Sequence, residues 1–132
     1  MDIEVTLDLK LQFEKRGGLL PAVVQDTDTQ KVLMLGYVNE EAITQSIKTG
    51  YATFYSTSRQ ELWTKGKTSG DLLAVTEILV DCDQDAVLMK VRTLGEGACH
   101  TKNKEGKHRE SCFYRKLTDI ERKRLSVVEG EE

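Results

Sequence analysis

Three carboxylates and a thiol lie within the five residues Asp81-Cys82-Asp83-Gln84-Asp85, and this stretch offers the clearest chemistry in the sequence. Carboxylate oxygens suit a hard cation such as Mg²⁺, whereas a thiolate suits a softer ion such as Zn²⁺. Where the backbone is extended, alternating side chains point to opposite sides, so one segment can serve both kinds of ion. The alternative is a solvated acidic turn. An EF-hand is excluded, because Ala86 and Arg92 stand where that loop needs Gly and Glu.

The three cysteines, Cys82, Cys99 and Cys112, form a second candidate site. Their spacing lacks the Cys-x2-Cys pair of zinc fingers and ribbons. Three thiolates around Zn²⁺ would leave one position for water, which is the catalytic arrangement. His100 is either a fourth ligand, which would make the site structural, or a group that transfers protons beside the metal. Inert buried thiols without any metal are the remaining alternative.

Hydroxyl residues, glycines and basic residues gather between Ser56 and Gly70, together with the only tryptophan, Trp63. Backbone amides next to glycine, hydroxyl donors and positive charge suit a phosphate group. The Trp63 ring offers a surface on which a base can stack. A polar surface loop anchored by one tryptophan is the alternative. The end of a P-loop is mimicked by Gly66-Lys67-Thr68, but Glu61 occupies the position of the required leading glycine.

Composition limits the class of protein. The 132 residues fit one domain, and the net charge of −3 argues against a generic nucleic-acid binder held by positive charge. No apolar run approaches the ~20 residues of a membrane span, and the first residues lack the basic and apolar regions of a signal peptide. These features predict a soluble cytoplasmic protein.

Two hairpins and one helix are the clearest elements that position these residues. Leu19–Gln25 and Lys31–Val38 flank a loop rich in turn formers and predict a β-hairpin. Asn39 is expected to cap a helix that ends at Thr49, before Gly50. Apolar runs at 72–80 and 86–91 predict a second hairpin with the acidic stretch at its tip.

Other segments give less regular patterns. Residues 51–56 are aromatic and β-branched and predict a strand. Alternation between Leu7 and Phe13 suggests a strand, followed by a turn of helix to Arg16. The amphipathic stretch Thr118–Leu125 predicts a short helix, and residues 126–132 are expected to form a disordered tail. We therefore predict one domain over residues 1–132, of the α+β class with mostly antiparallel strands.

Five stretches resemble, in order, motifs of the phosphoribosyl-AMP cyclohydrolase family, which performs the third step of histidine biosynthesis. The stretches are Leu33–Ala42, Tyr55–Arg59, Leu62–Gly70, Asp81–Ala86, and Ala98–Thr101 with Ser111–Arg115. The likeness runs from about Leu19 to Arg115. It implies a hydrolase that opens the adenine ring of 1-(5-phosphoribosyl)-AMP by adding water at C6 and breaking the N1–C6 bond.

The resemblance also implies a set of site residues, an assembly and a shape. Thiols expected to bind Zn²⁺ are Cys82, Cys99 and Cys112. Carboxylates expected to bind Mg²⁺ are Asp81, Asp83 and Asp85. His100 is expected to transfer protons in catalysis. Residues expected to bind the nucleotide substrate are Ser56, Ser58, Arg59, Trp63, Lys65, Gly66, Ser69 and Gly70. The expected shape is a compact barrel-like sheet capped by one helix, in an intertwined homodimer whose zinc sites are shared between subunits.

The sequence departs from the family pattern at two places. The family usually has Ser-Arg-Ser-Arg where this chain has Ser56-Thr57-Ser58-Arg59, so one positive charge is missing. The interval between Cys99 and Cys112 is also longer than usual and contains a basic loop, Thr101–Glu110. Either Lys67 or this loop can replace the missing charge. The rival interpretation is a zinc-stabilised nucleic-acid-binding module that uses the basic loop, for which salt-dependent binding would be the evidence.

Overall fold

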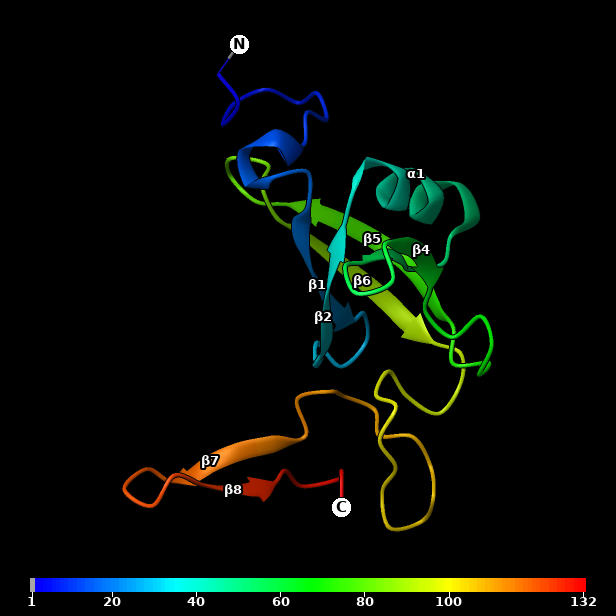
Figure 1. Ribbon diagram of the computed structural model, residues 1–132, viewed down its shortest axis with the longest axis vertical. Coiled ribbons are helices and arrows are strands. Elements are labelled where there is room, and N and C mark those ends of the chain that lie inside the picture. Colours follow the sequence, from blue (N-terminus) through cyan, green and yellow to red (C-terminus); the bar gives the residue numbers. More distant parts are fainter. Residues whose placement is uncertain (1) are drawn as a thin grey trace.

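The computed structural model describes residues 2–132 (Figure 1). Its main element is a four-stranded sheet with the strand order β2-β1-β6-β5. The strands are β1 (Leu20–Asp26), β2 (Val32–Val38), β5 (Leu73–Val80) and β6 (Val87–Thr93). Strands β1 and β6 run parallel, and the other neighbours are antiparallel. The two predicted hairpins, β1–β2 and β5–β6, are therefore confirmed.

The predicted helix is also confirmed as α1 (Glu40–Thr49). The Asn39 side chain accepts a hydrogen bond from the Ala42 amide at 2.8 Å, and Gly50 ends the helix in the left-handed conformation. After it, β3 (Thr53–Ser56) pairs antiparallel with β4 (Glu61–Thr64). Strand β4 was not predicted, because the polar residues around it have the composition of a loop.

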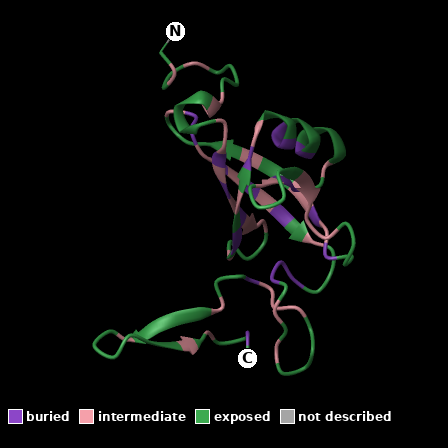
Figure 2. Ribbon diagram, in the orientation of Figure 1, coloured by how far each residue is buried: buried purple, intermediate pink, exposed green. Residues whose placement is uncertain are grey.

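The core lies between the four-stranded sheet and the layer formed by α1 and β3. Alternate residues of β1, namely Leu20, Ala22 and Val24, are fully buried, as the period of a strand with one covered face requires. Gly36 on β2 faces the ring of Phe54 on β3, and a Cβ at this position would lie 2.5 Å from the ring. Figure 2 shows the buried residues concentrated on these strands and on one side of α1.

The opposite face of the sheet carries a row of apolar side chains. Val23 on β1 lies opposite Leu35 on β2 and Leu88 on β6, and Leu88 lies opposite Leu79 on β5. Paired positions point to the same face, so the four side chains cross the whole sheet. Leu35 is 45% exposed and Leu79 is 40% exposed. We call Val23, Leu35, Leu79 and Leu88 the outer row.

The C-terminal region is a hairpin where a helix was predicted. Strands β7 (Arg115–Asp119) and β8 (Arg124–Val127) pair antiparallel and extend away from the main sheet (Figure 1). The helix prediction for Thr118–Leu125 was wrong, because Asp119 accepts a hydrogen bond from the Arg122 amide and Lys123 is left-handed, which makes a turn. The chain end, expected to be disordered, instead folds back: Glu131 is 2% exposed and accepts bonds from the Glu110 and Ser111 amides.

The N-terminal segment lies beside the acidic turn and does not form the predicted strand. Gln84, in the left-handed conformation, accepts the Lys10 amide on its side chain at 2.7 Å and the Gln12 amide on its carbonyl at 2.8 Å. These contacts replace the ladder that a strand would need. The predicted turn of helix is present as the 3-10 helix η1 (Phe13–Arg16).

The α+β class with mostly antiparallel strands is confirmed, but the barrel-like sheet is not. Within residues 2–132, β2 and β5 are the outer strands of the four-stranded sheet, and the pairs β3–β4 and β7–β8 form separate two-stranded sheets. The sheet is therefore open. Among the described helices, none has the length and apolar character needed to span a bilayer.

Candidate active site

Two of the predicted zinc ligands, Cys99 and Cys112, lie together between the main sheet and the C-terminal region. Cys99 is 4% exposed, whereas Cys112 is an exposed residue whose sulfur is only partly covered. The Cys112 amide donates to the Leu33 carbonyl at 2.7 Å, which fixes this residue against β2. Burial, followed by the close approach of Cys99, raises the pKa of Cys112 to about 11. Two adjacent thiols whose ionised forms repel each other suit a cation that neutralises both sulfurs.

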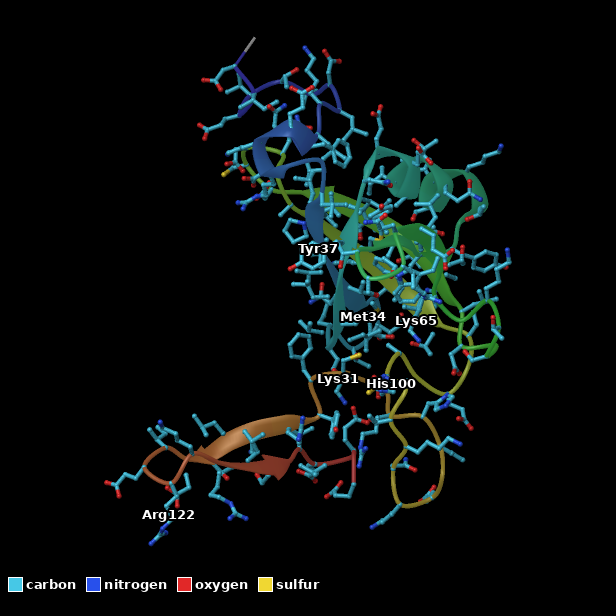
Figure 3. The ribbon with its side chains drawn as sticks, in the orientation of Figure 1. Lys31, Met34, Tyr37, Lys65, His100 and Arg122 are labelled. Carbon is cyan, nitrogen blue, oxygen red and sulfur yellow. The ribbon has the colours of Figure 1, made fainter. Side chains whose placement is uncertain are left out.

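Lys65 and His100 belong to the same end of the molecule. The charge of Lys65 acts on Cys112 and favours its ionised form, in opposition to burial. Figure 3 shows Lys65 at the lower end of the main sheet and His100 below it, on the loop that carries Cys99. His100 is exposed. One predicted substrate residue and the predicted proton-transfer residue therefore accompany the thiol pair.

The third predicted zinc ligand, Cys82, is not part of this group. Cys82 is exposed in the turn that joins β5 to β6, whereas Cys99 follows the other end of β6. The 7 residues of β6 span about 20 Å in an extended strand. Figure 1 shows the turn and the Cys99 loop at opposite ends of the sheet. Within one described chain, the three thiols do not meet.

The three predicted magnesium ligands do meet. Asp81, Asp83 and Asp85 each bring a carboxylate oxygen to within 4.8 Å of the others. Asp81 accepts hydrogen bonds from the Asp85 amide at 2.9 Å and from the Ala86 amide at 3.2 Å, which holds the turn closed. Such an all-oxygen donor set fits a hard divalent cation.

Two basic residues of η1 form ion pairs with two of the three carboxylates of this turn. Lys15 Nζ lies 2.8 Å from Asp83 and 3.1 Å from Asp85, and Arg16 lies 3.0 Å from Asp85. The side-chain interactions of Asp85 with Asp83 and Lys15 hold the pKa of Asp85 well below its usual range, while burial raises the pKa of Asp81. A cation bound here would compete with Lys15 for Asp83 and Asp85. Sequence reasoning did not find Lys15 and Arg16, because their contacts are distant in the chain.

The segment from Ser56 to Gly70 forms one wall of an open cavity of about 560 Å³. Its lining includes Arg59, Trp63, Gly66, Lys67, Thr68 and Ser69. Trp63 also packs against Phe54, with the ring centroids 5.3 Å apart. The predicted residues Ser56, Ser58, Lys65 and Gly70 lie outside the lining. The Ser56 and Ser58 hydroxyls lie 3.3 Å apart, and Ser56 accepts a bond from the Arg59 amide at 3.2 Å.

Comparison with known proteins establishes the family. The family model described as Phosphoribosyl-AMP cyclohydrolase matches residues 34–114, a range that contains every predicted site residue. The chain belongs to the phosphoribosyl-AMP cyclohydrolase family. It is 51% identical over 120 residues to the phosphoribosyl-AMP cyclohydrolase of Desulfatibacillum aliphaticivorans, covering 91% of this chain and 89% of the relative. The corresponding protein of Hyphomonas neptunium is 53% identical over 112 residues, covering 85% and 79%, and that of Archaeoglobus fulgidus is 50% identical over 109 residues, covering 83% and 94%.

The resemblance inferred from sequence is thus confirmed, and the protein is an enzyme of the phosphoribosyl-AMP cyclohydrolase family. A further group of possible ligands was not anticipated. Asp71, Glu96 and His108 each place a ligand atom within 4.8 Å of the other two. In the sequence, His108 stands out only as part of the basic loop, since no motif or spacing connects it with Asp71.

Proposed function

We propose that this chain catalyses the hydrolytic opening of the adenine ring of 1-(5-phosphoribosyl)-AMP in histidine biosynthesis. The oxygen of water bonds to C6, the N1–C6 bond breaks, and N1 takes up a proton, which leaves a carboxamide at the former C6. The proposal is carried by the grouping of Cys99, Cys112, His100 and Lys65 at one end of the sheet, in a chain of this family.

Cys82, Cys99 and Cys112 are the residues that we assign to a zinc ion. The donor chemistry fits, since Cys99 and Cys112 are paired in a partly buried place and Lys65 favours the ionised form of Cys112. Zinc held by three thiolates would supply Lewis acidity to a water in the fourth position. To His100, which is exposed and follows Cys99 in the chain, we assign the transfer of a proton from the attacking water and of a proton to the leaving nitrogen.

We propose that the zinc site is completed by a second copy of the chain, because Cys82 lies at the far end of the sheet. Two exposed apolar surfaces support a homodimer. One is the outer row across the sheet, and the other is the β7–β8 hairpin, on which Leu117 is 54% exposed and Leu125 is 51% exposed. The dimer that we propose is two-fold symmetric, with the acidic turn of each chain beside the thiol pair of its partner.

The remaining predicted residues are assigned to the substrate. Arg59, Ser69 and the neighbouring Lys67 line a cavity that suits phosphate and ribose, and the Trp63 ring in its wall suits a base. Asp81, Asp83 and Asp85 are assigned to Mg²⁺, which commonly binds through carboxylates together with a substrate phosphate. Arg59 is the one arginine left of the two that the family usually has, and Lys67 lines the same cavity.

An absorbance assay of ring opening on 1-(5-phosphoribosyl)-AMP, with and without a zinc chelator, tests the proposal. We expect turnover that the chelator abolishes and that added Zn²⁺ restores. Ring opening by protein that contains no zinc would contradict the metal assignment. Absence of turnover in zinc-loaded protein, together with salt-dependent binding of nucleic acid, would favour the nucleic-acid-binding alternative.

A further inference from the structure

Asp71 and His108 connect two loops that are far apart in the sequence. His108 Nδ1 lies 2.6 Å from Asp71 Oδ2, and the two side chains are 23% and 6% exposed. The other Asp71 oxygen accepts the Glu96 amide at 2.8 Å, and the Glu96 carboxylate accepts the His108 amide at 2.9 Å. The three residues thus form a closed ring of hydrogen bonds. The hydrogen bonds that Asp71 accepts favour its carboxylate, so Nδ1 of His108 is the donor.

Asp71 is attached on one side to the wall of the substrate cavity. It directly follows Gly70, whose amide donates to the Gly66 carbonyl at 2.8 Å. A Cβ on Gly66 would lie 2.1 Å from the carbonyl carbon of Asp71, so these two residues are in direct backbone contact. The position of the Gly66–Gly70 loop therefore depends on the position of Asp71.

His108 is attached on the other side to the loop that carries Cys99. The next residue, Arg109, accepts the Cys99 amide at 3.1 Å, and its own amide donates to the Thr101 carbonyl at 2.9 Å. A Cβ on Gly97 would lie 2.1 Å from the Arg109 carbonyl oxygen, so the two segments are packed backbone to backbone. A displacement of His108 would therefore displace Cys99 as well.

We propose that Asp71 and His108 are a positioning pair that holds the Gly66–Gly70 loop at a fixed distance from the Cys99 loop. The proposal rests on the function proposed above, in which the first loop binds substrate and the second carries zinc ligands. The same atoms form a poor cation site, because two ligands at ~2.1 Å from a tetrahedral metal lie about 3.4 Å apart, whereas Asp71 Oδ2 and His108 Nδ1 are already bonded at 2.6 Å.

Substitutions at His108 test the pair. The amide nitrogen of Asn occupies nearly the same place as Nδ1, so His108→Asn should keep kcat/KM within about threefold of wild type. His108→Ala should lower kcat/KM roughly 10- to 100-fold, because misplaced reacting groups cost rates of this order. A positioning role predicts that KM rises while kcat falls. In an Asp71→Asn background, the same alanine substitution should have a much smaller effect, because the two residues act together.

Glu105→Ala is the matched control, since Glu105 is exposed in the same loop and only its backbone amide is bonded. The control should leave both kinetic constants unchanged. Two results would overturn the pair: wild-type kinetics in His108→Ala, or a fall in kcat at unchanged KM that matches a loss of folded protein. If the wild type opens no ring, the proposed function fails instead. In that case, amide hydrogen exchange at Gly66–Gly70 tests the positioning pair independently of activity. We expect the exchange rate to increase about tenfold or more in His108→Ala and to stay unchanged in Glu105→Ala.

Discussion

Mixing two inactive cysteine variants tests whether the zinc site is shared between subunits. Cys82→Ser and Cys99→Ser each remove one ligand from every site, so each variant alone should be inactive. In a mixed dimer, one site receives both substitutions, Cys82→Ser from one subunit and Cys99→Ser from the other, and is lost. The second site combines Cys82 of one subunit with both Cys99 and Cys112 of the other and is intact.

The expected recovery follows from this arithmetic. Random association of equal amounts makes half of the dimers mixed, and each mixed dimer has one intact site out of two, so activity should return to about a quarter of wild type. Zinc bound per chain should rise in the same proportion. Cys82 and Cys99 of one chain are separated by the full length of β6, which is about 20 Å in an extended strand. They are too far apart to bind one zinc ion, so a site within a single chain cannot account for recovered activity.

The assay requires the two variants to be unfolded together, refolded with Zn²⁺ and checked for mixed dimers by native mass spectrometry. A mixture of Cys99→Ser with Cys112→Ser is the matched control. Both of these ligands come from the same subunit, so the mixed dimer has no intact site and should stay inactive. Mixed dimers without activity in the first mixture, or recovery in the control, would refute the shared site.

Three other substitutions have defined outcomes. His100→Ala should reduce turnover by about 10²–10⁴-fold while zinc content stays near one per chain, and a loss of zinc would make His100 a ligand. Hydrogen bonds from the Thr29 and Asp28 amides lower the pKa of Asp26 below its usual 3.8. The ionised side chain therefore stabilises the fold fully above pH 3.8, and this stabilisation is lost as the pH falls through the lowered pKa. Urea unfolding should therefore show Asp26→Asn to be less stable at pH 7, by at most about 1 kcal/mol, with little difference near pH 2. Gly36→Ala should cost about 1–3 kcal/mol, because the new Cβ meets a ring, and Phe54→Leu should recover part of this loss.

The parts of the fold that sequence predicted are those in which local pattern and tertiary packing agree. Helix α1 has a capping side chain at Asn39, a glycine stop at Gly50 and one buried face, all of which are visible in the sequence. The C-terminal hairpin shows the opposite case. Most residues of both strands are exposed, so the sequence lacks the alternation of apolar and polar residues that marks a half-buried strand. Without that alternation, β7–β8 cannot be distinguished from a short amphipathic helix.

The candidate site was predictable as a set of donors but not as an arrangement. The acidic turn could be located because its ligands are adjacent in sequence, and its three carboxylates do converge. Strand β6 separates Cys82 from Cys99, and a loop of residues 100–111 separates Cys99 from Cys112, so only the fold determines that Cys99 meets Cys112 and that Cys82 does not. Contacts such as Lys15 with Asp83 and His108 with Asp71 depend on packing between distant loops, for which the sequence contains no periodic or motif signal.

The acidic turn explains why a shared zinc site and a magnesium site would be coupled. Cys82 lies between Asp81 and Asp83, so any arrangement that brings Cys82 to the partner's thiol pair brings the carboxylates with it. A substrate phosphate held by Mg²⁺ on this turn would then lie beside the partner's Lys65 and His100. In one chain, the same turn is nearly the length of the sheet away from these residues, and Lys15 forms ion pairs with Asp83 and Asp85. A bound cation would release Lys15 from this five-residue turn. A second subunit would complete its thiol site with Cys82 from the same turn.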